Sequence, residues 1–295
     1  MTNDVTFQSD IGQIKRVLMK HAKDAFVSQD KIAREWQELN YLQAPDFNEA
    51  CREYDALLTL LQSLGVNIEL LPEDSRTTLD SLYTRDNAVA TNKGMLLCNM
   101  GKAQRANETL PQAEFYKVQN IPHINAMPEG ACMEGGDVTW LKDDLVAVGH
   151  GYRTNSAGIE FLQETVATTA REVITVPLPH FRGPSDVLHL MSMISPVADD
   201  IAVVYSPLMP VVFRKRLLDL GYQLIEVPVA EYDSLGCNVL TVSPGVCVVA
   251  EGAPMTQQAM RAAGIVVHTF KGQEICYKGS GGPTCLTRPL ERLTP

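Results

Sequence analysis

The segment GYQLIEVP, residues 221–228, decides the fold, because it is one of five near copies spread along the chain. Each copy is a short, apolar, strand-like run that follows an amphipathic helix, and most copies close on proline. The other copies are GVNIELLP (65–72), IPHINAMP (121–128), EVITVPLP (172–179) and GIVVHTF (264–270). Their spacing of about 45 to 55 residues is typical of a structural repeat.

The sequence also predicts the elements that precede these strands. In FNEACREYDALLTLLQSLG (47–65) apolar residues recur every three or four positions, which predicts a helix that stops at Gly65. Weaker versions of this helix are NSAGIEFLQETVATTA (155–170), VVFRKRLLDLG (211–221) and MTQQAMRAAG (255–264). Hairpins such as DVTWLKDDLVAVG (137–149) lie between them, with alternating apolar positions around a Lys-Asp-Asp turn.

Five units of strand pair, helix and strand indicate an α/β fold closed into a ring. Open repeat arrays normally need atypical polar end caps, and none is visible in this sequence. We therefore expect one domain over residues 1–295, with the loops at one end of every unit pointing toward the centre. Residues from distant parts of the chain would meet there.

Composition narrows the class of protein. The chain has 295 residues, 45% of them hydrophobic and 20% charged, which is ordinary for a globular protein. No run approaches the roughly 20 apolar residues that span a bilayer, and the N-terminus lacks a signal-peptide pattern, so we expect a cytoplasmic protein. The formal net charge of −10 disfavours binding to nucleic acid or anionic lipid and suits a small cationic substrate.

The seven cysteines are scattered without a CxxC pair, which fits neither a disulfide framework nor a structural zinc site. We therefore expect a reduced compartment, no metal and no cofactor. Cys98, Cys247 and Cys276 lie in strand-like apolar runs and are predicted to be core residues.

Four polar stretches interrupt this regular pattern. LDSLYTRDNAVAT (79–91) carries carboxylates that could hold a cation, although a solvated turn explains it equally simply. MEGGDVTW (133–140) has acids around two glycines, which allow a ligand close to the backbone or merely form a tight turn. SDVLHLMSMI (185–194) places His189 within an apolar, strand-like run, where a histidine is more often a core residue than a catalyst.

The fourth stretch is GSGGPTCLTRPL (279–290), where turn residues directly precede Cys285. Taken together, the four stretches bring one cysteine, one histidine and several carboxylates to the predicted ring centre. This set suits nucleophilic attack by a thiolate on a cationic carbon. A bound cation or a charged His189 would favour the thiolate, whereas burial alone would oppose it.

The motifs TRDNAV (84–89), EGGDV (134–138), LHL (188–190) and GGPTC (281–285) also occur in this order in a known superfamily. The chain resembles the guanidine-modifying enzymes of the pentein fold, an α/β propeller of five ββαβ units around a pseudo-fivefold axis. These enzymes include arginine deiminases, amidinotransferases and dimethylarginine dimethylaminohydrolases, and the resemblance to the last group is greatest. It covers nearly the whole chain.

The resemblance implies roles for the residues in these motifs. Cys285 would be the nucleophile and His189 the general acid and base. Glu134 would hold His189 or the guanidinium. Asp86 would bind guanidinium nitrogens, and Asp80 would contact the amino-acid end of the substrate.

Further positions of the family pattern are also occupied. Arg105 and Arg153 match arginines that recognise the substrate's α-carboxylate, although each also suits a structural role in its loop. Asp137 and Arg85 complete the expected substrate-binding set. Arg85 stands where dimethylarginine enzymes have glutamate, so the sequence Thr-Arg-Asp is more similar to that of arginine deiminases. Met191, in contrast, stands where deiminases have an aspartate.

The resemblance therefore implies a hydrolase that cleaves a guanidinium C–N bond of arginine or a methylated arginine. A cysteine-bound intermediate would give citrulline and an amine or ammonia. An arginine deiminase and an amidinotransferase, which passes the amidino group to an amine, are the alternatives within enzymes. A non-catalytic pentein binding protein is the alternative from another class. The expected partner is a small cationic guanidino amino acid, and a homodimer is allowed but not required.

Overall fold

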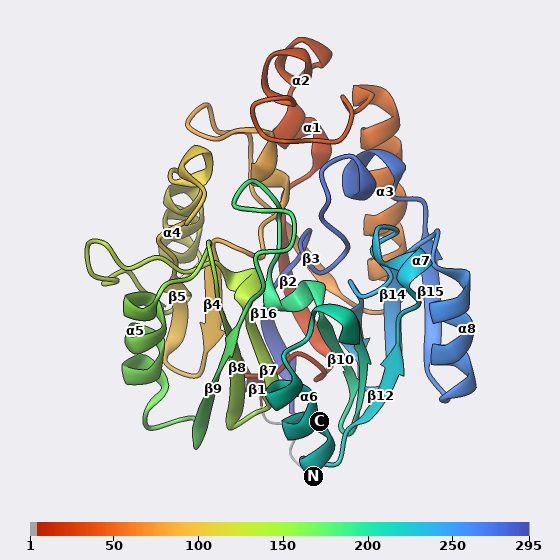
Figure 1. Cartoon of the computed structure of the whole chain (residues 1–295). Coiled ribbons are helices and arrows are strands. Elements are labelled where there is room, and N and C mark those ends of the chain that lie inside the picture. Colours follow the sequence, from red (N-terminus) through yellow and green to blue (C-terminus); the bar gives the residue numbers. More distant parts are fainter. Residues whose placement is uncertain (1–4, 295) are drawn as a thin grey trace.

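The computed structural model describes residues 5–294 and contains five small β-sheets, with helices placed outside them (Figure 1). Four sheets share one design, in which two antiparallel strands are followed by a helix and then by a third strand parallel to the second. The predicted units of strand pair, helix and strand are thus confirmed.

The four sheets follow one another along the chain. Their strands are β4 (Ala88–Thr91), β5 (Gly94–Leu97) and β6 (His123–Ile124); β7 (Val138–Lys142), β8 (Leu145–His150) and β9 (Glu172–Pro177); β10 (Ile194–Ala198), β11 (Ile201–Val204) and β12 (Gln223–Glu226); and β13 (Leu240–Ser243), β14 (Val246–Ala250) and β15 (Val266–Phe270). The helices within these units are α4 (Thr109–Val118), α5 (Ser156–Val166), α6 (Val211–Asp219) and α8 (Pro254–Ala262). In Figure 1, α4 and α5 flank the sheets on one side and α8 on the other.

The remaining sheet joins the two ends of the chain. Strand β16 (Arg288–Leu293) pairs antiparallel with β2 (Ile14–Met19), which runs parallel to β3 (Asn67–Leu70). The short strand β1 (Val5–Thr6) pairs with the free edge of β16. The last strand of the chain therefore supplies the first strand of the first unit, and this closes the ring that the repeat predicted.

The helices of the first unit lie between β2 and β3. They are α1 (Ala22–Phe26), α2 (Gln29–Glu35) and α3 (Phe47–Ser63). Helix α3 begins at Asp46, whose side chain accepts a hydrogen bond from the Glu49 backbone N–H, an N-cap that satisfies an unpaired donor. The chain leaves this helix through Gly65 with φ of 81°, so the predicted stop is confirmed.

Short helical turns occupy several of the segments that connect the longer helices and the strands. They are the 3-10 turns η1 (Leu79–Leu82), η2 (Ala103–Arg105), η3 (Gly135–Asp137), η4 (Leu190–Ser192) and η5 (Ser206–Leu208), the helix α7 (Val229–Tyr232) and the π-helical turn η6 (Gln273–Tyr277). Cys98, Cys247 and Cys276 are buried, as predicted. Cys276 lies in η6 rather than in a strand, which corrects that part of the prediction.

Within residues 5–294, none of the helices combines the length and the apolar character that crossing a bilayer requires.

Candidate active site

The polar stretches predicted to face the ring centre come together just before the first strand of each sheet. Asp86 precedes β4, Glu134 precedes β7, His189 precedes β10 and Cys285 precedes β16. Asn238, which precedes β13, completes the set. Each of the five units therefore contributes one polar side chain to a common centre, because equivalent loops of a ring meet on its axis.

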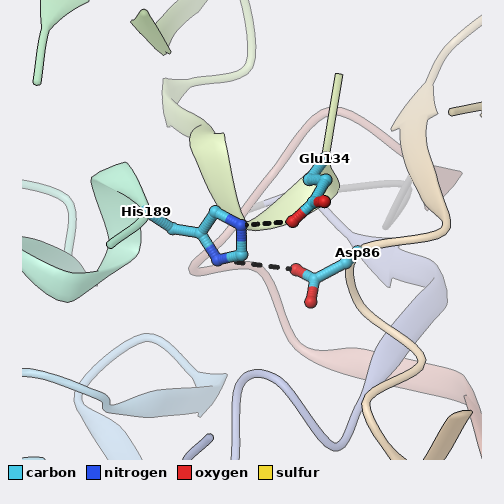
Figure 2. A group of neighbouring side chains, drawn as sticks. All are labelled: Asp86, Glu134 and His189. Atoms are coloured by element: carbon cyan, nitrogen blue, oxygen red, sulfur yellow. Dashed lines mark hydrogen bonds and ion pairs between the residues drawn. The ribbon is translucent and has the colours of Figure 1, made fainter. Parts of the chain in front are cut away.

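His189 lies between two carboxylates, as Figure 2 shows. Its Nε2 is 2.7 Å from Oε2 of Glu134, and its Nδ1 is 3.9 Å from Oδ1 of Asp86. A Cβ atom on Gly136 would lie 2.5 Å from that Nδ1, so only glycine fits in this turn. His189 caps the short turn η4 before β10, so the expectation that it lies inside a strand is wrong.

The charges around His189 favour its protonated form. Burial alone would lower the pKa of His189, but the carboxylates of Asp86, Asp137 and Glu134 outweigh burial and raise that pKa to about 9. Burial likewise opposes ionisation of Glu134, but His189 and Arg153 hold the pKa of Glu134 below its ordinary value. At neutral pH the pair is an imidazolium and a carboxylate, which equips His189 to act as an acid.

Asp86 is held by a guanidinium and by the backbone. Its Oδ2 accepts a hydrogen bond of 2.6 Å from Arg105, and its Oδ1 accepts one of 3.0 Å from the Gly136 N–H. Arg105 also donates to both carboxylate oxygens of Glu108 and to the carbonyl of Tyr83. With Nε, Nη1 and Nη2 all engaged, Arg105 fixes Asp86 instead of standing free for a substrate carboxylate.

Asp80 is paired with a lysine that the sequence analysis did not single out. The Nζ of Lys102 lies 2.6 Å from Asp80 Oδ2 and 2.8 Å from the carbonyl oxygen of Leu39. The backbone N–H of Lys102 donates to Glu134 Oε1 at 3.0 Å. The ammonium of Lys102 thus occupies the position on Asp80 that the family resemblance gives to the substrate's amino-acid end.

Arg153 and Asp137, which belong to the same unit as Glu134, hold Glu134 and the turn of His189 in place. Arg153 donates to Glu134 Oε2 at 3.2 Å. Asp137 accepts a hydrogen bond from the Thr154 hydroxyl at 2.7 Å and from the Leu190 N–H at 3.0 Å, so it fixes the turn that carries His189. Burial raises the pKa of Asp137 to about 6.

Arg85 faces away from this cluster. Its Nη2 is 2.7 Å from Asp10, a buried carboxylate near the N-terminus. Only its backbone reaches the loop of Cys285, because the Arg85 N–H donates to the carbonyl oxygen of Cys285 at 3.1 Å. This placement gives Arg85 no contact with the group around His189, in contrast to the role expected from the sequence.

Cys285 lies in a turn between η6 and β16 and is partly exposed. Its Sγ is 3.3 Å from the side-chain amide of Asn238, whose Oδ1 accepts a hydrogen bond from the Thr284 N–H at 3.0 Å. A Cβ atom on Gly282 would lie 2.4 Å from the Asn238 side chain, so the glycine-rich run is required by close packing. This favours a rigid turn over a hinge.

The thiol of Cys285 is mostly protonated in the free protein. Burial and the negative charge of Asp86 raise the pKa of Cys285 to about 11, although the Asn238 amide partly offsets them. At pH 7 only about one thiol in 10⁴ would be ionised. A cation bound next to the sulfur would therefore be needed to generate the thiolate.

Cys285 lies between two cavities. The larger, of about 480 Å³, is lined by Gly136, His189, Asn238 and Cys285 together with Phe181, Tyr232 and other residues. The smaller, of about 20 Å³, is lined by Cys285 and by charged residues, namely Asp80, Asp86, Lys102, Arg105 and Arg153. His189 therefore lines the larger cavity, whereas the charged groups that surround Asp86 line the smaller one.

Asp86, Glu134 and His189 are also the residues, within the described part of the chain, that could together hold a metal ion. Their candidate ligand atoms all lie within 4.8 Å of one another. Arg105 and Arg153 already supply positive charge to the two carboxylates. A metal ion would have to compete with these guanidinium groups, so the arrangement suits acid–base chemistry better than metal binding.

Known proteins are similar to this chain over most of its length. The arginine deiminase of Mycobacterium avium is 30% identical over 289 residues, which cover 80% of this chain and 71% of that protein. A structure of the dimethylarginine dimethylaminohydrolase of Pseudomonas aeruginosa, a mutant complexed with citrulline, has a TM-score of 0.74 at 20% identity and covers 93% of this chain and 98% of its own. The product-bound N-terminal domain of ArgZ, a cyanobacterial arginine dihydrolase, has a TM-score of 0.79 at 18% identity. The match covers 96% of this chain and 100% of the ArgZ domain.

The fold and the family match together place the chain in the guanidine-modifying pentein superfamily. The family model described as N,N dimethylarginine dimethylhydrolase, eukaryotic, matches residues 22–291, and the chain belongs to this family. The chain spans 65% of the arginine deiminase of Listeria welshimeri and 60% of that of Rhodococcus erythropolis.

Proposed function

We propose that this protein hydrolyses a guanidinium C–N bond of arginine or a methylated arginine through an intermediate bound to Cys285. The products would be citrulline and ammonia or a methylated amine. The observation that carries the proposal is that the Cys285 thiol and the charged His189 open on one cavity, with the Asp86 carboxylate beside them.

The first half of the reaction breaks the C–N bond. The guanidinium binds beside Asp86 and lowers the pKa of Cys285, whose proton passes to solvent. The thiolate attacks the central guanidinium carbon and forms a tetrahedral adduct. This adduct collapses when His189 donates its proton to the departing nitrogen, so the amine leaves neutral and an amidino group remains on the sulfur.

The second half releases the product. Neutral His189 takes a proton from water, and the resulting hydroxide attacks the amidino carbon. The C–S bond breaks and its electron pair returns to sulfur, while the surplus proton on the ureido product goes to solvent. Glu134, held by Arg153, keeps His189 oriented and restores its affinity for the proton.

Electrostatic attraction is large enough to orient the substrate. A carboxylate about 4 Å from the guanidinium contributes on the order of 4 kcal/mol at an effective dielectric constant near 20, before desolvation is subtracted. The same attraction between the bound cation and the thiolate would lower the Cys285 pKa by roughly three units. Binding of the cation would thus produce a useful fraction of thiolate at neutral pH.

The two cavities suggest how the substrate lies. Because His189 lines the larger cavity, the departing amine would leave there. The amino-acid end of the substrate would enter the smaller cavity, where Arg153 and the Asp80-bound Lys102 would bind the α-carboxylate. That cavity is small, so the hydrogen bond between Lys102 and the Leu39 carbonyl would have to break when the amino-acid end of the substrate enters.

Alkylation of the thiol tests the role of the bound cation. 2-Chloroacetamidine, which is positively charged, is expected to inactivate the protein at pH 7 at least about 100-fold faster than neutral 2-chloroacetamide, because only the cation lowers the Cys285 pKa. With the neutral reagent the alkylation rate should rise about tenfold per pH unit up to the Cys285 pKa of about 11, because the thiolate fraction rises tenfold per pH unit in this range. Equal rates for the two reagents at pH 7 would contradict substrate-assisted activation.

A panel of guanidino compounds tests the proposed reaction. A colour assay for ureido product is run on arginine, monomethylarginine, asymmetric dimethylarginine and agmatine. At least one amino acid should yield citrulline, whereas agmatine, which lacks a carboxylate, should have a kcat/KM at least about 100-fold lower. Absence of a ureido product from all four compounds would contradict hydrolysis, and transfer products with added ornithine or glycine would identify an amidinotransferase instead.

A further inference from the structure

A second group of buried charges lies behind the nucleophile and takes no part in the reaction above. It contains the guanidinium groups of Arg85, Arg288 and Arg292, which are 2%, 4% and 2% exposed. Within residues 5–294, the one carboxylate paired with any of them is Asp10, which lies 2.7 Å from Arg85. Three buried positive charges therefore face one negative charge. Arginine stays protonated in proteins, so deprotonation does not remove this imbalance.

Several donors in this group lack partners. Arg288 donates through Nη1 to the Ala88 carbonyl, and Arg292 donates through Nη1 to the Thr241 carbonyl, both at 2.8 Å. Five further buried donors form no hydrogen bond within residues 5–294: Nε and Nη1 of Arg85, Nε of Arg288, Nε of Arg292 and Oγ1 of Thr284. Buried donors are nearly always paired in native proteins, so this set indicates an occupant that accepts hydrogen bonds.

Three of the four residues with unpaired donors in this group, all except Arg288, line one small cavity. Arg85, Thr284 and Arg292 all line a cavity of about 10 Å³, together with Asp10 and Met191 among others. A space of that size holds about one water-sized particle. Asp10 is a charged carboxylate, but it is paired with Arg85 and accepts a hydrogen bond from the Trp140 N–H, so the net charge of the group stays positive.

The protonation behaviour of the group agrees with a missing negative charge. Burial and the charge of Arg85 lower the pKa of Arg288 to about 9. Burial lowers the pKa of Arg292 to about 10, and Arg85 adds to this effect although Asp10 opposes it. A neutral water molecule would accept hydrogen bonds from the unpaired donors but would leave the positive charge uncompensated. An anion would accept the hydrogen bonds and also compensate the charge.

We propose that this cavity binds one monatomic anion of chloride size, held by Arg85, Arg292 and Thr284. The volume excludes phosphate, sulfate and carboxylates. The site is next to the catalytic cysteine in sequence and in space, because Thr284 precedes Cys285 and the Arg85 N–H donates to the Cys285 carbonyl. The anion would thus join the loop before β4 to the loop before β16.

Crystals of the full chain grown in sodium bromide test the site directly. The expected result is an anomalous bromide peak in the cavity, within hydrogen-bond reach of Arg85, Arg292 and Thr284. In parallel, replacing 0.1 M chloride by gluconate at equal ionic strength should lower Tm by about 4 °C, because an anion that binds only the folded state stabilises it. No bromide peak in the cavity, or peaks at the surface alone, would overturn the proposal and leave water as the occupant.

Two matched threonine variants test the ligand set without removing a charge. Thr284→Val loses the unpaired hydroxyl and should need about tenfold more chloride to reach half of the Tm rise. Thr287→Val is the control, because the Thr287 hydroxyl donates to the Pro283 and Thr284 carbonyls and does not line the cavity. Its chloride dependence should match the unmodified protein. An unchanged chloride dependence in Thr284→Val would overturn the assignment.

Discussion

Replacement of Cys285 by serine is expected to lower citrulline formation by at least about 10⁴-fold while the protein stays folded. The hydroxyl of serine ionises far less readily than a thiol, and the bound guanidinium lowers its pKa too little to give an alkoxide. Removal of a covalent nucleophile has effects of this order in other enzymes. The measurements are kcat by the colour assay and Tm by circular dichroism.

A matched variant separates this effect from general damage. Cys51 is also a partly exposed free cysteine, but it lies in α3 outside the site, so Cys51→Ser should keep full activity. The Cys285 sulfur takes part in hydrogen bonds with the Asn238 amide and the Gly282 backbone, which the serine hydroxyl can also accept, so the substitution should change Tm by only a few degrees, about what 1 kcal/mol produces. Substantial turnover by Cys285→Ser would rule out the covalent scheme.

Replacement of His189 by alanine is expected to lower kcat by about 10³-fold, because the side chain acts first as the acid and then as the base. The pH profile gives a second readout. In the unmodified protein the acid form of His189 is present below its pKa of about 9 and is lost above it, so activity should fall as pH rises through that value. His189→Ala should lose this falling limb.

His123 provides the control for this variant. It lies in β6, is partly buried and contacts none of the residues around Cys285, so His123→Ala should keep both the rate and the pH profile. A His189→Ala variant that keeps the falling limb would show that another group is the acid.

The sequence repeat predicted most of the fold. Strands and helices with strong local periodicity, such as those around α3 and β12, were predictable because their apolar faces recur along the sequence. The closure of the ring by β16 was inferred but could not be located, because the segment RPLERL (288–293) contains no local signal for its partner β2. Pairing across the whole chain is decided by tertiary packing.

The candidate site was predictable where a residue type implies chemistry. Cys285, His189, Glu134 and Asp86 lie together as expected. Asn238 was missed because a lone asparagine implies no reaction, yet its position before the first strand of the fifth unit follows the same rule as the others. A search for one polar residue before every first strand would have found it.

Arg85 shows why adjacent residues were harder to separate. Arg85 and Asp86 are neighbours in the turn that precedes β4, and their side chains leave this turn in different directions. Asp86 therefore faces His189, whereas Arg85 faces Asp10. Lys102 was missed for a different reason, because its partner Asp80 is 22 residues away in sequence and no motif links them.

Intact-protein mass spectrometry after acid quenching tests the central claim most directly. The protein is mixed with the substrate that the panel identifies and quenched during turnover. We predict a species heavier by the substrate less its departing amine, with the added mass on the peptide that contains Cys285, and its absence in Cys285→Ser. Citrulline formation with no such adduct at any quench time, or with the adduct on another residue, would contradict the account.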